Sequence, residues 1–200
     1  MLNAGLSTLD YLKSRILPEA SREETTWDEA LSKIGLAIAR RMEGHCARLF
    51  DRAENAVDEF SAWTLAITLR RYPVEAITDI STRTFTGAVE SATLSYNLSE
   101  SSGLIEFPQV PGTQDQRLVI TYTGGYWLDD GDAMPSGATP LPDDLLEIWI
   151  SEIQATAEAR SIFDAIGLRS QKDSAKSSKP NGLSEDAVDA LKPYRRFSGQ

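Results

Sequence analysis

The stretch ITYTGGYWLDDGDAMPSGATPLPDDLLEIW, residues 120–149, changes from strand-like to helix-like sequence. Ile120 and Tyr122 alternate with threonines, which is the period of a strand with one buried face. Two glycines end the alternation, and a loop rich in Pro, Gly and Asp follows. After Pro142 the apolar residues take helical spacing, and proline followed by two carboxylates is typical of a first helical turn. The stretch therefore predicts a strand joined by a loop to a helix, in a protein of the α+β class.

Three segments have the apolar spacing of amphipathic helices. Residues 26–48 show the clearest pattern, with apolar side chains three and four positions apart. Thr26 followed by Glu29 resembles a capping box at the start of this segment. Further helices are predicted for residues 6–17 and 143–166. We expect the N-terminal and C-terminal helices to form a mainly helical core.

The middle of the chain has the period of strands. Apolar residues alternate with polar or small ones in segments 65–69, 92–98 and 118–122. Plausible turns lie between them, at Gly87, residues 101–103 and residues 108–112. The pattern predicts a small antiparallel β-sheet, inserted into the helical core over about residues 64–123.

The end of the chain divides into a polar segment and a short amphipathic one. Residues 170–182 contain almost no apolar side chains and are predicted to be a flexible linker after a single domain of residues 1–169. Residues 183–200 are too few to build a core, so we expect them to dock on a partner surface. The candidate partner-binding residues are Leu183, Val188, Leu191, Tyr194, Arg195, Arg196 and Phe197. Deletion after Gly182 is expected to leave the fold intact and to weaken attachment.

Net charge and hydropathy exclude several classes of protein. The formal charge of -10 argues against binding nucleic acid by neutralising its phosphates. An acidic wall repels a polyanion, which suits a passage through which DNA moves without sticking. No apolar run approaches the roughly 20 residues of a membrane-spanning helix. The first residues lack the unbroken apolar run of a signal peptide, and Cys46 has no disulfide partner in the chain. We therefore expect synthesis in the cytoplasm and no membrane partner.

Residues that could perform catalysis do not converge in the sequence. The only histidine, His45, is adjacent to Cys46, and neighbouring positions of a helix point about 100° apart. A histidine-based nucleophile or zinc site therefore has too few residues. Gly124-Gly125 lacks the spacing of a phosphate-binding loop. The sequence predicts no catalytic residue and no cofactor site.

One acidic cluster leaves a metal site open as an alternative. Asp129, Asp130 and Asp132 surround a glycine, and calcium loops gather carboxylates in such turns. Their spacing is not that of an EF-hand, so a solvated loop is the favoured interpretation and no metal site is predicted. A small metal-dependent enzyme using these aspartates remains the alternative to a purely structural role.

Five elements follow one another in a defined order: RRMEGHCARLF, LRRYPVEAITDIS, LVITYTGGYW, LPDDLLEIWISEI and ALKPYRRF. In this order they resemble the head-tail connector (adaptor, or head-completion) proteins of tailed bacteriophages. The elements YPV-x-x-I, Y-x-x-G-Y and LP-x-x-L carry most of the likeness, which spans about residues 26–167. The C-terminal LKPYRR is a second point of agreement.

The resemblance implies a virion structural protein with a helical core, a β insertion and no enzymatic activity. In that family, copies form a ring, typically a dodecamer, beneath the portal protein at the head-tail interface. The ring extends the DNA channel without sequence-specific binding and presents a surface to the tail or to a stopper protein. By the same likeness, the segment from Leu183 to Phe197 is implied to dock on the portal or on a neighbouring subunit. The resemblance also implies that the protein is synthesised in the host cytoplasm and then incorporated into the virion. A generic adaptor module of a cellular complex differs only in its partner and stays open.

Overall fold

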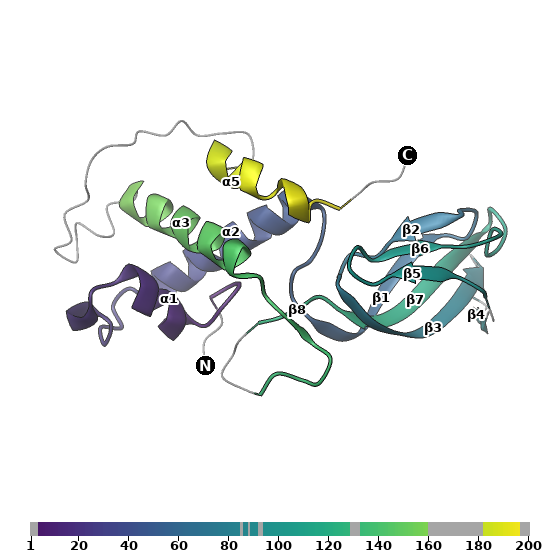
Figure 1. Cartoon of the computed structure of the whole chain (residues 1–200), viewed down its shortest axis with the longest axis horizontal. Helices are drawn as coiled ribbons and strands as arrows, with labels where there is room; N and C mark the ends of the chain where they lie inside the picture. The colour runs from purple at the N-terminus through teal and green to yellow at the C-terminus, as the bar shows by residue number, and fades with distance from the viewer. Residues whose placement is uncertain are drawn as a thin grey trace. The chain divides into compact units, whose positions relative to one another are not determined.

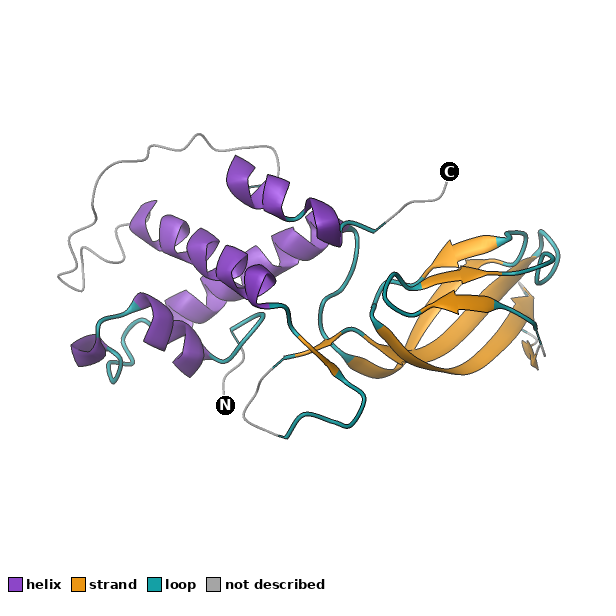
Figure 2. Cartoon of the chain, viewed as in Figure 1, coloured by secondary structure: helices purple, strands orange, loops and turns teal. Residues whose placement is uncertain are grey.

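The computed structural model describes residues 4–84, 86–87, 89–91, 94–128, 133–159 and 182–196. The chain folds into two compact units. A helical unit takes its residues from Met1–Ala47, Leu128–Ala133 and Leu141–Arg195. A β unit takes its residues from Arg48–Trp127, Met134–Pro140 and Arg196–Gln200. Figure 2 shows that the described helices belong to the first unit and the described strands to the second.

The helical unit is built around a pair of long helices. Its elements are α1 (Leu9–Ile16), η1 (Glu19–Ser21), α2 (Asp28–Cys46), α3 (Asp143–Ala159), α5 (Glu185–Ala190) and η2 (Lys192–Tyr194). α2 packs against α3, while α1 contacts both of these helices and α5 contacts α3 (Figure 1). None of the described helices is long and apolar enough to cross a membrane.

The observed helices lie within the predicted segments, with shorter bounds. α1 occupies residues 9–16 of the predicted 6–17, and α2 occupies 28–46 of 26–48. α3 begins at Asp143 as predicted and is described to Ala159, so the predicted continuation over 160–166 lies outside the described residues. The predicted capping box does not form. The N-cap of α2 is Trp27, whose side chain makes no capping hydrogen bond, and Glu29 pairs with Lys33 one turn later.

The described segment that begins at Ala4 is part of the core of the helical unit. Trp149 of α3 is fully buried and donates its indole N–H to the carbonyl of Gly35 at 2.9 Å. A Cβ at Gly35 would lie 2.2 Å from the carbonyl oxygen of Ala4, so only glycine lets the N-terminal segment cross α2 at this point. Ala4 and Leu6 are buried there. Sequence periodicity predicted a helix over residues 6–17 but no contact of the residues just before it, and the structure places Ala4 in the core.

The β unit contains two antiparallel sheets and one short parallel pair. The first sheet has the order β1-β7-β3-β4, from β1 (Ala53–Ser61), β7 (Gln116–Gly124), β3 (Val74–Thr84) and β4 (Val89–Ser91). The second has the order β2-β6-β5, from β2 (Ala66–Thr68), β6 (Leu104–Glu106) and β5 (Asn97–Ser99). β8 (Tyr126–Trp127) pairs in parallel with β9 (Thr139–Pro140). Residues of both sheets, among them Ile67, Ile105, Leu118 and Ile120, share one apolar core.

The β region starts earlier than the predicted residue 64. β1 begins at Ala53, and its periodicity is weak because the inward positions include small Ala56 and charged Asp58. The predicted turns at Gly87 and Gly103 are present, and both glycines have a positive φ. The turns and β7 agree with the sequence pattern, whereas β1 had no apolar pattern to predict it.

The mixed α+β class is confirmed, but the mainly helical core is not. Helix and strand residues are about equally common, and the strands enclose an apolar core of their own. The division into a domain of residues 1–169, a linker of 170–182 and a docking segment of 183–200 stays a prediction. Residues 160–181, which include most of that linker, lie outside the described residues.

Candidate interaction surfaces

Two of the motifs that carry the family resemblance meet at one end of the β unit. Gly125 donates its backbone N–H to the carbonyl of Pro73 at 2.9 Å, and Tyr126 donates to the carbonyl of Phe50 at 2.7 Å. Isolated parallel bridges join Leu49 to Arg71 and Asp51 to Tyr126. The YPV and Y-x-x-G-Y segments therefore lie beside the segment that enters β1.

The two glycines of this end are required by close backbone approach. Gly125 has a φ of 101°, and a Cβ there would lie 2.4 Å from the carbonyl oxygen of Asp51. A Cβ at Gly124 would lie 2.8 Å from the carbonyl oxygen of Arg71. Side chains cannot occupy such positions without moving the backbone. Gly124-Gly125 is thus a packing element of the sheet.

A buried arginine lies among the aromatic residues of the same end. The Arg48 guanidinium carbon is 3.4 Å from the centroid of the Tyr72 ring, and the rings of Tyr126 and Phe50 are at 5.1 and 5.3 Å. Its Nη2 donates to the carbonyl of Tyr72, while Nε has no hydrogen-bond partner among the described residues. Aromatic faces attract a cation, so the rings stabilise this charge in the interior. Arg48 therefore holds together the segments on which the motifs lie.

A second buried group, Asp58, joins β1 to β7 and to the segment before Tyr72. The Asp58 carboxylate, which is 2% exposed, accepts the Tyr122 hydroxyl at 2.9 Å. It also accepts the backbone N–H of Arg70 at 2.8 Å and the Nε–H of Arg70 at 2.7 Å. Burial, followed by the nearby carboxylate of Asp58, raises the pKa of the Tyr122 phenol. The hydrogen bond and charge of Asp58 raise the pKa of Arg70. Both partners therefore stay protonated, and Asp58 has three donors.

An open pocket of about 580 Å³ lies along β1 and is lined by Val57, Asp58, Glu59, Phe60, Arg70 and Arg196. All six residues belong to the β unit. Glu59 is paired with Arg83, and Asp58 with Arg70. Arg196 donates to the carbonyl of Thr68, and its guanidinium carbon lies 6.0 Å from the centroid of the Phe60 ring. The pocket is therefore lined by the aromatic ring of Phe60 and by the guanidinium of Arg196. Arg196 is in none of the ion pairs of the described residues.

The predicted partner-binding residues are divided between buried and accessible positions. Leu183 and Leu191 are 2% and 0% exposed in the helical unit. Val188, Tyr194 and Arg196 are partly exposed, Arg195 is exposed, and Phe197 lies outside the described residues.

Polar contacts also attach this segment to the helical unit. Ser184 donates its backbone N–H to Glu152 at 3.1 Å, and the Tyr194 hydroxyl donates to Asp144 at 2.6 Å. The partner-binding role of the segment stays a prediction. Within the described segment, only the side chains that remain accessible could contact a partner directly.

The candidate chemical groups do not form a site in the described part of the chain. Cys46 is buried, and its Sγ lies 3.9 Å from the carbonyl oxygen of Leu191. No group of three His, Cys, Asp or Glu residues that could hold a metal ion occurs among the described residues. Asp129, Asp130 and Asp132 lie outside them. Arg70 and Arg71, a conspicuous basic pair in the sequence, bind Asp58 and Asp51 of the same unit.

Three chains of solved particle structures share the fold over the full length of this chain. The first belongs to the neck of an empty gene transfer agent (GTA) particle, determined with C6 symmetry, with a TM-score of 0.60 and 15% identity over 100% of this chain and 94% of that chain. The second, from the virion of a native GTA particle, has the same TM-score, identity and coverage. The third, from the neck of a native GTA particle with C12 symmetry, has a TM-score of 0.58 at the same identity and coverage. The chain shares its fold with these chains of GTA particles.

This fold confirms the resemblance to head-tail connector proteins at the level of architecture. No protein-family model matches the sequence, and no curated protein is significantly similar to it. The structural likeness covers the whole chain, including the residues before Thr26, which lie outside the span of the sequence motifs.

Sequence reasoning missed Arg48 and Asp58 as organising residues. Asp58 lies two residues after Ala56 and two residues before Phe60, on the same inward face of β1. A charged residue in such an alternating apolar series was the sequence feature that could have indicated a buried carboxylate. Arg48 is two residues before Phe50 and carried no comparable signal, because its aromatic partners Tyr72 and Tyr126 are distant in sequence.

Proposed function

We propose that this chain is a structural component of the neck of a phage-like particle. In this role, copies form a ring beneath the portal protein, extend the DNA channel and join the head to the tail. The observation that carries the proposal is the fold match over 100% of the chain to chains of GTA necks. The ring is supported by the rotational symmetries with which those necks were determined.

The charge of the chain is compatible with a DNA channel. The formal net charge is -10, and DNA carries a dense row of negative phosphates. A lumen wall of like charge keeps the polyanion from binding as it passes. A twelve-fold ring with the portal above it and a tail or stopper protein below it is the arrangement that we propose.

The C-terminal segment is proposed to contribute to attachment. Leu183 and Leu191 anchor it within the helical unit, and the residues that stay accessible include Val188, Tyr194 and Arg195. The hydrogen bonds from Ser184 to Glu152 and from Tyr194 to Asp144 fix the position of the segment, so a partner would bind an ordered surface.

Location in the particle tests the proposal. Antibodies against this chain, visualised with gold on purified particles, are expected to label the junction of head and tail. Particles made without the chain are expected to be heads that lack tails. Label on the tail tip or the capsid faces, or intact tailed particles without the chain, would contradict the proposal.

A further inference from the structure

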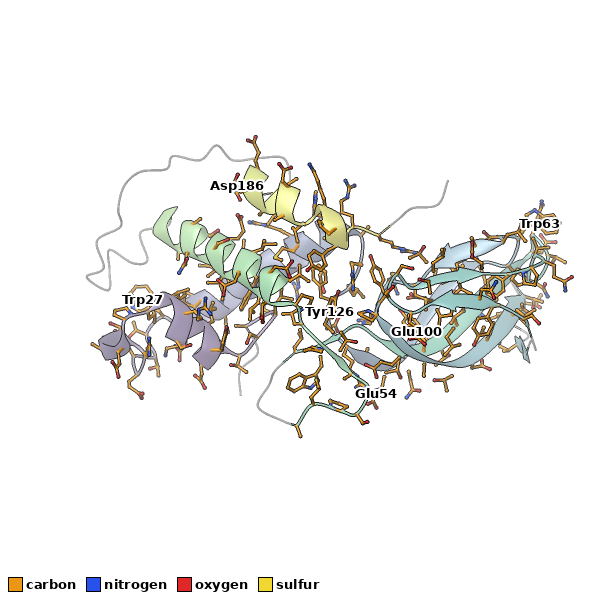
Figure 3. The ribbon with its side chains drawn as sticks, in the orientation of Figure 1. Trp27, Glu54, Trp63, Glu100, Tyr126 and Asp186 are labelled. Carbon is orange, nitrogen blue, oxygen red and sulfur yellow. The ribbon has the colours of Figure 1, made fainter. Side chains whose placement is uncertain are left out.

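Strand β1 has one edge that no other described strand covers. β1 stands at the end of the sheet order β1-β7-β3-β4, and it pairs with β7 alone. Figure 3 labels Glu54, near the beginning of β1, and the exposed Trp63, just beyond its end. An uncovered strand edge presents a row of backbone N–H and C=O groups with which a further strand can pair.

The register of the β1–β7 ladder shows which backbone groups lie on this edge. Ala62 donates its backbone N–H to the carbonyl of Gln116 at 3.1 Å, which marks a hydrogen-bonded pair at the end of the ladder. Such pairs alternate with non-bonded pairs in an antiparallel ladder, so the N–H and C=O groups of Val57 and Glu59 point away from β7. Among the described residues, no hydrogen bond reaches these groups. Val57 and Glu59 therefore offer backbone donors and acceptors to an added strand.

The open pocket along β1 is a groove at this edge. Its lining includes four consecutive residues of the strand, 57–60, together with Arg70 and Arg196. Asp58 is buried and Val57 is 49% exposed, because successive side chains of a strand point to opposite faces of the sheet. A groove that contacts the side chains of both faces runs along the edge of the strand, beside the unbonded backbone groups.

The C-terminal part of the chain leads into this groove. After η2 the backbone is extended at Arg195, with a φ of -69° and a ψ of 134°. Arg196 belongs to the β unit, where its Nη2 donates to the carbonyl of Thr68 and its guanidinium carbon lies 6.0 Å from the centroid of the Phe60 ring. The residues that follow Arg196 therefore start beside the groove.

The next residues of the chain, 197–200 (FSGQ), suit the free edge in length and composition. In extended conformation they reach about 13 Å, whereas the distance along β1 from Val57 to Glu59 is about 7 Å. They include no proline, so each of them has a backbone N–H that can donate to β1. The segment can therefore pair with both residues of the edge.

We propose that residues 197–200 add a strand to the free edge of β1, with backbone hydrogen bonds to Val57 and Glu59. Main-chain hydrogen bonds supply the binding in this mode, and attachment at Arg196 keeps the segment close to its site. The added strand covers an edge that otherwise pairs with other chains. Phe197, a residue that the sequence suggested as a partner contact, is then assigned to the chain's own β unit. The inference concerns a single chain and does not depend on the neck role.

Amide hydrogen exchange of the full-length chain, measured by NMR, tests the pairing. The amides of Val57 and Glu59 are expected to be protected in the wild type. Deletion of residues 197–200 should speed their exchange by about tenfold or more, because each loses its hydrogen bond. The amides of Asp58 and Phe60 face β7 and should keep their rates, so they are the control within the same strand. Unprotected Val57 and Glu59 in the wild type, or equally faster exchange at all four amides, would overturn the inference.

Proline variants separate backbone pairing from other ways of covering the edge. Successive N–H groups of a strand point to opposite sides, so one of Ser198→Pro and Gly199→Pro removes a donor that faces β1. That variant should reproduce the fast exchange of Val57 and Glu59. Ser198→Ala keeps the backbone donor and is the matched control, with protection retained. Wild-type exchange in both proline variants would contradict the pairing.

Dilution identifies the occupant of the edge. Pairing within one chain does not depend on concentration, so the protection of Val57 and Glu59 should be the same over a wide range of protein concentrations. Protection that increases with concentration would assign the edge to a strand of another copy and would overturn the inference.

Discussion

The helical unit and the β unit are stabilised in different ways. In the helical unit, the α2–α3 pair packs mainly through apolar side chains, and the indole N–H of Trp149 donates to the carbonyl of Gly35. The buried charges of this unit, Lys13 and Glu152, lie beside that pair or at its edge, where they bind Asp28 and Ser184. In the β unit, the apolar core is accompanied by buried Asp58 and Arg48, each held by partners distant in sequence. Buried charges require such partners, because desolvation without them is unfavourable.

Because of this difference, we expect the two units to be destabilised by different kinds of substitution. A helix pair held by apolar packing responds mainly to lost volume. A sheet whose strands share a buried carboxylate responds to the loss of one hydrogen-bonding atom. Substitutions in the two units therefore distinguish the two kinds of stabilisation.

The largest effect is expected in the helical unit, from Trp149→Ala. Removal of a fully buried tryptophan leaves a cavity and should lower the free energy of unfolding by about 3–5 kcal/mol. Urea unfolding followed by circular dichroism at the helix band measures this change. Trp63→Ala is the matched control, and a surface change of this kind should stay within about 0.5 kcal/mol. Equal effects of the two substitutions would show that Trp149 is not a core residue.

In the β unit, Asp58→Ala should lower the free energy of unfolding by about 2–3 kcal/mol, because three hydrogen bonds to a charged acceptor are lost. The half-exposed Arg70 side chain can be rehydrated, which limits the effect. Asp79→Ala, at an exposed position of β3, is the control in the same urea experiment. A loss for Asp58→Ala no larger than for Asp79→Ala would remove the contrast between the units.

Removal of residues after Gly182 tests whether the C-terminal segment belongs to the helical unit. Burial of Leu183 and Leu191 outweighs the ordering of the segment by a small margin, so we expect a loss of about 1–3 kcal/mol. Cys46 contacts Leu191, so its reaction with a thiol reagent should be faster in the truncated chain. An unchanged rate and stability would support the expectation from sequence, that the segment serves attachment alone.

The smallest effect is a pH dependence that arises from Tyr122. Its pKa is raised in the folded state, so above pH 10 the unfolded chain loses this proton first and the folded state loses stability. Relative to Tyr122→Phe, the wild type should have lost about 1.4 kcal/mol of its free energy of unfolding by about pH 11. Urea unfolding of both proteins at a series of alkaline pH values measures the difference. Parallel curves for the two proteins would show that the Tyr122 environment does not differ between the folded and unfolded states.

The difference between apolar packing and buried charge also determines which helices and strands could be predicted from the sequence. The period of apolar residues predicted α2, α3 and β7, because one buried face fixes each of these elements. β1 was missed because its inward face includes Asp58, a residue that periodicity counts as exposed. The role of Gly35 depends on the backbone of Ala4, and local patterns carry no signal of such a crossing.

The candidate surfaces were predictable only in part. The C-terminal segment was recognised as amphipathic, but the burial of Leu183 and Leu191 against the chain's own helices could not be read from its spacing. The motifs Y-x-x-G-Y and YPV were recognised as family markers, and their meeting around Arg48 required the fold. The pocket along β1 combines residues from positions 57 to 196 and had no local signature.

Reconstruction of the particle neck by electron cryo-microscopy is the most direct test of the central claim. The account predicts density for this chain as a ring of identical copies around the particle axis, between portal and tail. Absence of the chain from the neck, or its presence there as isolated copies without rotational symmetry, would contradict the account.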